Sequence, residues 1–162
     1  MATLGVSFEF VQDVLYLFGP NLDRLGLREP EVYGSQTFDE LSSYCRDIAE
    51  EYSLSASVIQ TNSEAVFIES IHQAMQTYRA IILNPGAFTH YSYAIADALS
   101  MFLGPKLEVH LSNIFARELW RHRSVVSPVV SGSIVGLGAL GFKLATGAVS
   151  AILTGVGSQP GG

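Results

Sequence analysis

Residues 80–90 have the sequence AIILNPGAFTH, in which a short apolar run leads directly into a polar turn. The run does not alternate with polar residues, which is typical of a strand buried on both faces of a sheet. We therefore predict a strand at about 80–84, followed by a loop. Four other runs have the same character and predict further strands, at about 11–18, 55–60, 106–111 and 132–137.

Helical patterns separate these runs. The first begins with Thr37-Phe38-Asp39-Glu40, a capping-box sequence, and then places four apolar residues on one face. Strands that alternate with helices predict a parallel sheet covered on both sides. Five such units suit a flavodoxin-like, doubly wound fold with three layers, α/β/α, better than an eight-stranded barrel, which needs about 250 residues. The apolar face holds Leu41, Cys45, Ile48 and Tyr52, and later helices are expected at about 63–78, 91–102, 115–121 and 139–153.

The composition predicts one self-associating domain. The 162 residues suit a single catalytic domain, 1–162, with a core at about 11–153 and a loose tail at 154–162. Apolar residues make up 48% and charged residues only 15%, against about 25% in typical domains. This balance excludes intrinsic disorder and suggests surface buried between subunits. The net charge of −6, with seven Arg and two Lys, argues against a nucleic-acid partner.

Targeting signals and disulfides are not expected. Cys45 is the single cysteine, so no disulfide framework can form within the chain, and we predict that it is a core residue. The N-terminus lacks a basic start and carries Glu9 in its apolar part, unlike a secretory signal. Residues 124–157 carry one charge, but Pro128 and the five glycines at 132–147 interrupt them, which favours a buried strand and helix over a membrane anchor. We expect a cytoplasmic protein with no membrane partner.

Polar residues gather in the loops that follow the predicted strands. Ligands of open parallel sheets bind beyond the carboxyl ends of the strands, so these loops are the expected site. The polar residues concerned are Asn21, Asn84, His90, Ser112 and Asn113.

The loop after the first strand, FGPNLDRLGLREPEVYG at 18–34, is long enough to be a lid. Within it Arg28 and Tyr33 are close enough to face each other across a bend. A phenol has a pKa of ~10, and lowering it by ~3 units for base catalysis requires about 4 kcal/mol of preferential stabilisation of the phenolate. The alternative is a surface tyrosine packed on the lid. The residues expected to anchor the lid are Leu22, Leu25, Leu27 and Val32.

Glu108 and His110 share one face of the predicted fourth strand, because side chains alternate with period two. The carboxylate could orient the imidazole and keep it protonated, which suits a general acid. The alternative is a core histidine. His90 closes the turn after Asn84 and could bind a ligand or only cap the following helix.

Arg117 and Arg121 flank Trp120 and would share a helical face, where one guanidinium could meet an anionic or hydroxylated substrate. The alternative is a solvated basic face.

Two cofactor motifs are weak. Residues 136–141 match G-x-G-x-x-G, but no Asp or Glu occurs after Glu118 to bind a ribose, so the glycines are expected to allow close helix–sheet packing. Glu108, His110 and His90 have the side chains of a metal site, yet no metal-binding spacing supports one. We expect neither metal nor cofactor.

Four blocks closely resemble the type II 3-dehydroquinate dehydratases. The blocks are FGPNLDRLGLREPEVYG at 18–34, NPGAFTH at 84–90, EVHLSN at 108–113 and the Arg117–Arg121 segment. They occur in the same order as in the family, and the resemblance covers about residues 12–153. The resemblance implies a flavodoxin-like, cofactor-free lyase. It would convert 3-dehydroquinate to 3-dehydroshikimate by anti elimination through an enolate, in the shikimate pathway or in quinate breakdown.

The resemblance also implies catalytic roles. Tyr33 would be the base that removes the proton beside the ketone, and Arg28 would hold it as a phenolate. Asn21 would help to stabilise the enolate oxygen. His110 would protonate the departing hydroxyl, with Glu108 orienting its ring.

Substrate contacts are implied at matching positions. Asn84 and the backbone amides of Leu111 and Ser112 would hold the substrate, the amides its carboxylate. His90 and Arg121 would bind ring hydroxyls.

Members of the family assemble as trimers grouped into dodecamers, and Asp97 would reach a neighbouring subunit's site. Many members have His at the positions of Ser63, Phe115 and Arg123, so this chain departs from the family pattern around the site, where the difference would affect the rate more than the reaction. A binding module of the same fold without turnover is the alternative function.

Overall fold

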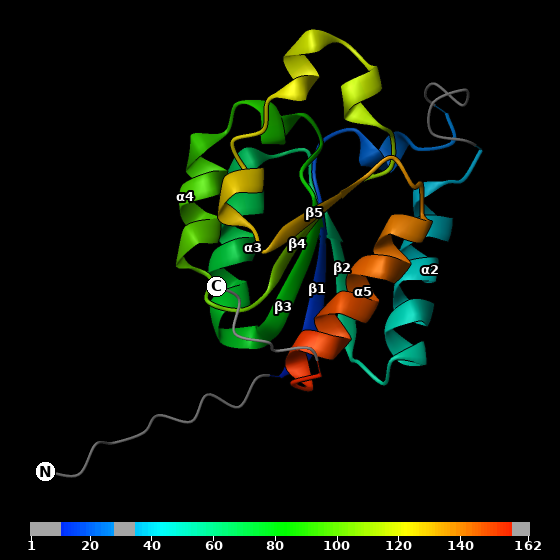
Figure 1. The fold of residues 1–162 in the computed structure, drawn as a ribbon, viewed down its shortest axis with the longest axis vertical. Coiled ribbons are helices and arrows are strands. Elements are labelled where there is room, and N and C mark those ends of the chain that lie inside the picture. The colour runs from blue at the N-terminus through cyan, green and yellow to red at the C-terminus, as the bar shows by residue number, and fades with distance from the viewer. Residues whose placement is uncertain (1–10, 28–34, 157–162) are drawn as a thin grey trace, which may run out of the picture.

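The computed structural model describes residues 11–27 and 35–156, which form one five-stranded parallel sheet (Figure 1). The strand order β2-β1-β3-β4-β5 is the flavodoxin-like order, and the predicted fold class is confirmed. The strands are β1 (Gln12–Phe18), β2 (Ala56–Gln60), β3 (Tyr78–Asn84), β4 (Lys106–His110) and β5 (Gly132–Val135).

Helices cover both faces of the sheet. In Figure 1, α2 and α5 lie on one side and α3 and α4 on the other, which gives the predicted three layers. The expected helix at 115–121 is wrong, because the chain there forms two 3-10 helices, η3 (Ile114–Ala116) and η4 (Leu119–His122). The α-helices are α2 (Phe38–Glu51), α3 (Glu64–Thr77), α4 (Tyr93–Met101) and α5 (Leu140–Leu153).

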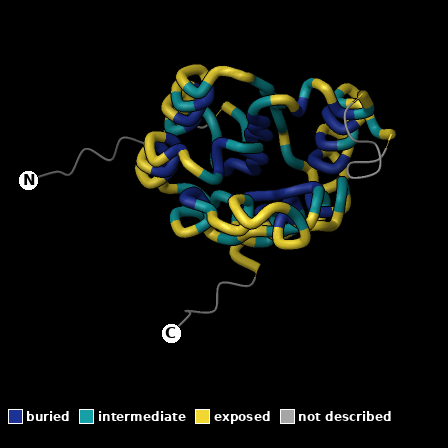
Figure 2. The backbone as a smooth tube through the Cα atoms, turned by 90° about the horizontal axis from the view of Figure 1, so that it is seen from above, coloured by how far each residue is buried: buried dark blue, intermediate teal, exposed yellow. Residues whose placement is uncertain are grey.

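The continuous apolar run of β1 supplies two cores. Val14, Tyr16 and Phe18 pack towards α2 and α5, while Leu15 and Leu17 pack towards α3 and α4. Figure 2, viewed from above, shows the buried residues gathered towards the middle of the molecule and the exposed residues around the outside. Both faces of β1 are therefore buried, which explains why its apolar residues do not alternate with polar ones.

The predicted capping box is present. The Glu40 amide donates to Thr37 Oγ1, and the Thr37 amide donates to Glu40 Oε2. Cys45 is fully buried, and burial raises the pKa of its thiol, as expected of a core residue. The prediction that Tyr52 lies on the apolar face of this helix is wrong, because Tyr52 follows the end of α2 and is 39% exposed.

Residues 124–156 contain β5 and α5, in agreement with the predicted strand and helix. The helix packs closely on the sheet at Gly141, where an added Cβ would lie 2.9 Å from Val109 Cγ1. The close-packing interpretation of the glycine motif thus holds at this position. Strand β5 is an edge strand and only partly buried. Among the described helices, none has the length and apolar character needed to cross a membrane.

Strand register brings the loops together at one edge of the sheet. Phe18 pairs with Gln60 on β2 and with Asn84 on β3, and His110 pairs with Val135. The carboxyl ends of the strands therefore meet at the same level.

Candidate active site

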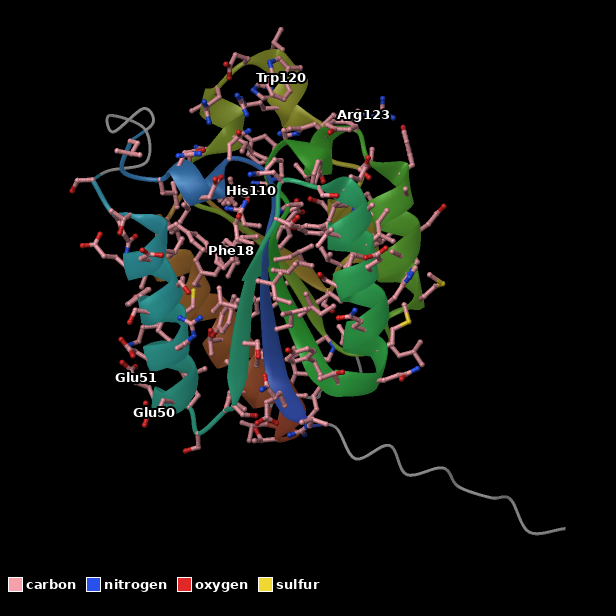
Figure 3. The ribbon with its side chains drawn as sticks, turned by 180° about the vertical axis from the view of Figure 1, so that it is seen from behind. Phe18, Glu50, Glu51, His110, Trp120 and Arg123 are labelled. Carbon is pink, nitrogen blue, oxygen red and sulfur yellow. The ribbon has the colours of Figure 1, made fainter. Side chains whose placement is uncertain are left out.

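A cavity of about 260 Å³ lies beyond the carboxyl ends of β1, β3 and β4. In Figure 3, His110 lies at this end of the sheet below Trp120, whereas Glu50 and Glu51 lie at the opposite end of α2. The position agrees with the expectation for an open parallel sheet. Predicted site residues on its wall are Asn21, Asn84, His90, His110, Leu111, Ser112 and Arg121.

The Glu108–His110 pair lies on β4 with the geometry that period-two alternation predicts. Glu108 Oε1 is 2.8 Å from His110 Nε2, and the Glu108 side chain is fully buried. Because Nε2 is engaged, Nδ1 is the ring nitrogen left for a ligand.

The pKa of Glu108 is lowered although the group is buried. Burial alone would raise the pKa, but hydrogen bonds from His110, Ser127 and Thr89, together with the charge of His110, outweigh it. The carboxylate is therefore ionised at neutral pH.

His90 carries a defined tautomer in its neutral form. Its Nδ1 lies 2.7 Å from the Arg123 carbonyl, which can only accept, so Nδ1 donates and Nε2 is an acceptor. Desolvation lowers the pKa of His90, with smaller contributions from His110 and Arg121 in the same direction. Its ring is stacked with that of His110, with 6.5 Å between the ring centroids. It meets the Trp120 ring edge-to-face, with 5.1 Å between centroids. The histidine can thus accept a hydrogen bond from a ligand.

Two guanidinium groups enter the cavity wall beside one carboxylate. Arg121 Nε is 2.7 Å from Glu118 Oε2, and Arg117 Nε is 3.7 Å from the same oxygen. Their side chains are only 14% and 12% exposed, so they do not form the solvated basic face considered as an alternative. Arg121 Cζ also lies 4.0 Å from the centroid of the Trp120 ring, a cation–π contact.

The loops after β1 and β3 meet at very short range. An added Cβ at Gly19 would lie 2.4 Å from the Pro85 carbonyl oxygen. Beyond Gly19, Asn21 adopts a left-handed conformation with φ 66°, and its amide donates to Asn62 Oδ1 at 2.8 Å. Asn84 Oδ1 accepts from the Gly86 amide at 3.1 Å. Asn84 is therefore held within its own loop, whereas Asn21 is held by the loop after β2.

The family model described as dehydroquinase class II matches residues 12–150. The chain belongs to the class II dehydroquinase family. Its curated relatives include the 3-dehydroquinate dehydratase of Anoxybacillus flavithermus, 49% identical over 143 residues, which are 88% of this chain and 97% of that protein. The enzyme of the same name from Bacillus subtilis is 52% identical over 131 residues, 81% of this chain and 88% of the relative. The crystal structure of the type II dehydroquinase from Propionibacterium acnes has a TM-score of 0.83 at 45% identity, covering 88% of this chain and 98% of that one.

Two catalytic residues implied by the family resemblance fall outside the described residues, and Asp97, an implied substrate contact, lies away from the cavity wall. Arg28 and Tyr33 lie outside the described residues, as does Val32 of the expected lid anchor. Asp97 lies on the exposed side of α4 and does not line the cavity. Leu27 corrects the lid prediction, because it is 80% exposed while Leu22 and Leu25 are buried.

Several residues around the site had no predicted role. Hydroxyl groups of Thr89, Ser127 and Ser133 surround Glu108, and Asn62 holds the backbone at Asn21. Asn62 lies in the loop after the second strand, so the topology could have pointed to it. Nothing in the local pattern marks the hydroxyl residues. Within residues 11–27 and 35–156, no three His, Cys, Asp or Glu side chains group as metal ligands would.

Proposed function

We propose that this chain is a hydro-lyase that dehydrates 3-dehydroquinate to 3-dehydroshikimate. Membership of the class II dehydroquinase family supports this activity, and relatives about half identical carry the name 3-dehydroquinate dehydratase. The observation that carries the proposal is a histidine on the wall of a small polar cavity, held at 2.8 Å by a buried carboxylate. Such a pair suits proton donation to a leaving hydroxyl.

The proposed reaction is an anti elimination through an enolate. Tyr33, held as a phenolate by Arg28, removes the proton beside the ketone, and the electron pair moves onto the carbonyl oxygen. Asn21 helps to stabilise that oxygen. When the enolate collapses, the C–O bond breaks and His110 protonates the hydroxyl, which leaves as water. A net proton transfer from Tyr33 back to His110 restores the enzyme.

Substrate recognition follows from the chemistry of the wall. The amides of Leu111 and Ser112 suit the substrate carboxylate, and the Asn84 side chain adds a further polar contact. His90 Nε2 can accept from a ring hydroxyl, because the Arg123 carbonyl fixes the proton on Nδ1. Arg121 donates to a second hydroxyl.

The finer parts of the proposal concern assembly and location. We place the enzyme in the cytoplasm as trimers grouped into dodecamers, in which Asp97 reaches the neighbouring subunit's site. The same reaction would serve the shikimate pathway or quinate breakdown.

Turnover without any added cofactor tests the activity. Purified protein treated with chelator and freed of nucleotide should convert 3-dehydroquinate to a product with the ultraviolet absorption of a conjugated enone. Folded protein that binds the substrate without producing this absorption would instead be the non-catalytic binding module. Activity that depends on added metal or NAD would also contradict the proposal.

Replacement of the base separates chemistry from binding. Tyr33→Phe should abolish turnover while leaving affinity nearly unchanged, because the phenolate acts in the transition state. Trp120 is the single tryptophan and lines the cavity, so its fluorescence can report binding. A Tyr33→Phe variant that keeps full turnover would remove Tyr33 from the mechanism.

A further inference from the structure

We propose that Thr89 and Ser127 are positioning residues that hold the Glu108 carboxylate in place for His110. The inference rests on the proposed function, in which His110 protonates the departing hydroxyl. Neither residue lines the cavity, so the inference extends the functional unit beyond the groups that can touch substrate.

The contacts come from segments far apart in the chain. Thr89, in η2 (Gly86–His90), donates to Glu108 Oε1, the oxygen that also contacts His110. Ser127, at the start of η5 (Ser127–Val129), donates to Oε2 at 2.5 Å, and Ser133 on β5 lies 3.3 Å from the same oxygen. We call Thr89, Ser124, Ser127 and Ser133 the hydroxyl cluster.

The hydrogen bonds that lead from Glu108 to Ser124 have only one possible set of donors and acceptors. An ionised carboxylate only accepts, so the Thr89 hydroxyl must donate to Glu108. The Thr89–Ser124 contact of 2.7 Å then has Ser124 as the donor. Ser124 Oγ in turn accepts from the amides of Val126 and Ser127, at 3.1 and 2.8 Å. The segment after η4 thus orients the hydroxyl groups towards Glu108.

This arrangement suits a permanently charged carboxylate. Glu108 is fully buried, and a buried charge is tolerated when its lone pairs are occupied by donors. The ionisable groups that act on it are His110 on the same strand and His90 from η2, next to Arg121 of η4. The low pKa of Glu108 agrees with the geometry. Removal of a donor should raise that pKa and let the carboxylate turn away from His110.

Thr89→Val tests the role of the first hydroxyl, because it removes the oxygen but keeps the side-chain shape. We expect kcat to fall by about tenfold, with KM and Trp120-reported affinity nearly unchanged. The ratio of wild-type kcat to variant kcat should grow by about fivefold from pH 8 to pH 5, because Glu108 becomes protonated in the variant. Thr89→Ser, which keeps the hydroxyl, should recover most of the wild-type kcat and most of its pH dependence.

Ser127→Ala removes the donor to Glu108 Oε2, and the same loss of kcat and the same pH dependence are expected. This variant tests the proposal if Thr89→Val does not fold. Ser131→Ala is the matched control, since Ser131 lies in the same segment but accepts from the Lys106 amide at 3.1 Å. We expect Ser131→Ala to match the wild type at every pH.

The outcomes separate this inference from the proposed function. A wild-type protein without turnover would refute the proposed function itself. If the wild type is active and the kcat ratio is the same at all pH values for folded Thr89→Val or Ser127→Ala, the positioning role is wrong and the hydroxyls are structural. Equal effects of Ser127→Ala and Ser131→Ala would also overturn it.

Discussion

Glu108 is a fully buried carboxylate that depends on several hydrogen-bond donors. Its side chain has no exposure, yet it accepts from His110, Thr89 and Ser127, with Ser133 within 3.3 Å. A buried carboxylate that loses a partner leaves an uncompensated charge, which is strongly destabilising. Its value to the protein therefore depends on the complete set of donors.

Glu108→Gln should lower kcat by about 100-fold, because the group that orients the histidine loses its charge. Substrate affinity, followed by Trp120 fluorescence, should change much less than kcat. A variant that binds and turns over like the wild type would show that His110 needs no anionic partner.

Glu108 should also contribute to acid sensitivity. Its folded-state pKa is lowered, whereas the unfolded value is about 4.3, so its stabilising effect is complete above that pH and is lost as pH falls through the folded pKa. The difference in unfolding free energy between wild type and Glu108→Gln should be constant above about pH 6 and become less favourable to wild type below about pH 4. Denaturant titrations across this range measure it, and a difference independent of pH would contradict the prediction.

At the scale of the elements, the loops after β1, β2 and β3 contact and stabilise one another. Gly19 after β1 contacts the Pro85 backbone after β3, and Asn62 after β2 accepts from the Asn21 amide. Gln60 also donates to the Gly19 carbonyl at 3.2 Å and to Asn62 Oδ1 at 3.1 Å. The three loops thus form a connected unit, of which the loops after β1 and β3 line the cavity.

Gly19→Ala should destabilise the fold by about 2–3 kcal/mol, because the new Cβ would meet backbone atoms that cannot turn aside. Gly132→Ala is the matched control, where the nearest atom would be a Leu107 methyl group at 3.4 Å. Urea unfolding compares the two. Equal stability of both variants would mean that the β1 and β3 loops can separate freely.

Adjacent residues in the β2 loop should separate rate from stability. Asn62→Ala removes the acceptor for the Asn21 amide and should lower kcat by about tenfold. Ser63→Ala removes the cap on the Val66 amide at the start of α3 and should cost about 1 kcal/mol of stability with kcat unchanged. Kinetics and thermal unfolding of both variants measure this, and a normal kcat for Asn62→Ala would contradict the positioning of Asn21.

At the scale of the whole molecule, large apolar side chains are exposed on and beside α4. Tyr93 and Met101 are 60% and 53% exposed on α4, and Asp97 lies between them at helical spacing. Leu103, just beyond the helix, is 97% exposed. An apolar face that surrounds one carboxylate is a suitable surface for subunit contact.

The protein should therefore have a solution mass that is a multiple of the 17.5 kDa chain. The assembly proposed above predicts the mass of a trimer or a dodecamer. Met101→Glu should reduce this mass by placing a charge in the apolar face. Light scattering after size-exclusion chromatography measures both. A monomeric wild-type protein would contradict the assembly and the proposed contribution of Asp97 to a neighbouring site.

Local sequence was sufficient for the strands, the capping box at Thr37 and the pairing of Glu108 with His110. These features depend on periodicity and on residues within a few positions of each other, so their physical cause is present in a short segment. The same locality explains the errors. Neither the exposure of Tyr52 nor the break in the predicted 115–121 helix is set by a residue's own neighbours.

The surroundings of Glu108 required the folded chain. Thr89, Ser127 and Ser133 are common polar residue types with no local signature. They meet the carboxylate because the segment after β3, the segment before β5 and β5 itself all pack beside β4. The contact between Asn62 and Asn21 likewise joins loops 41 residues apart. Candidate residues for the site could thus be named from the sequence, whereas the groups that hold Glu108 and Asn21 came from packing between distant segments.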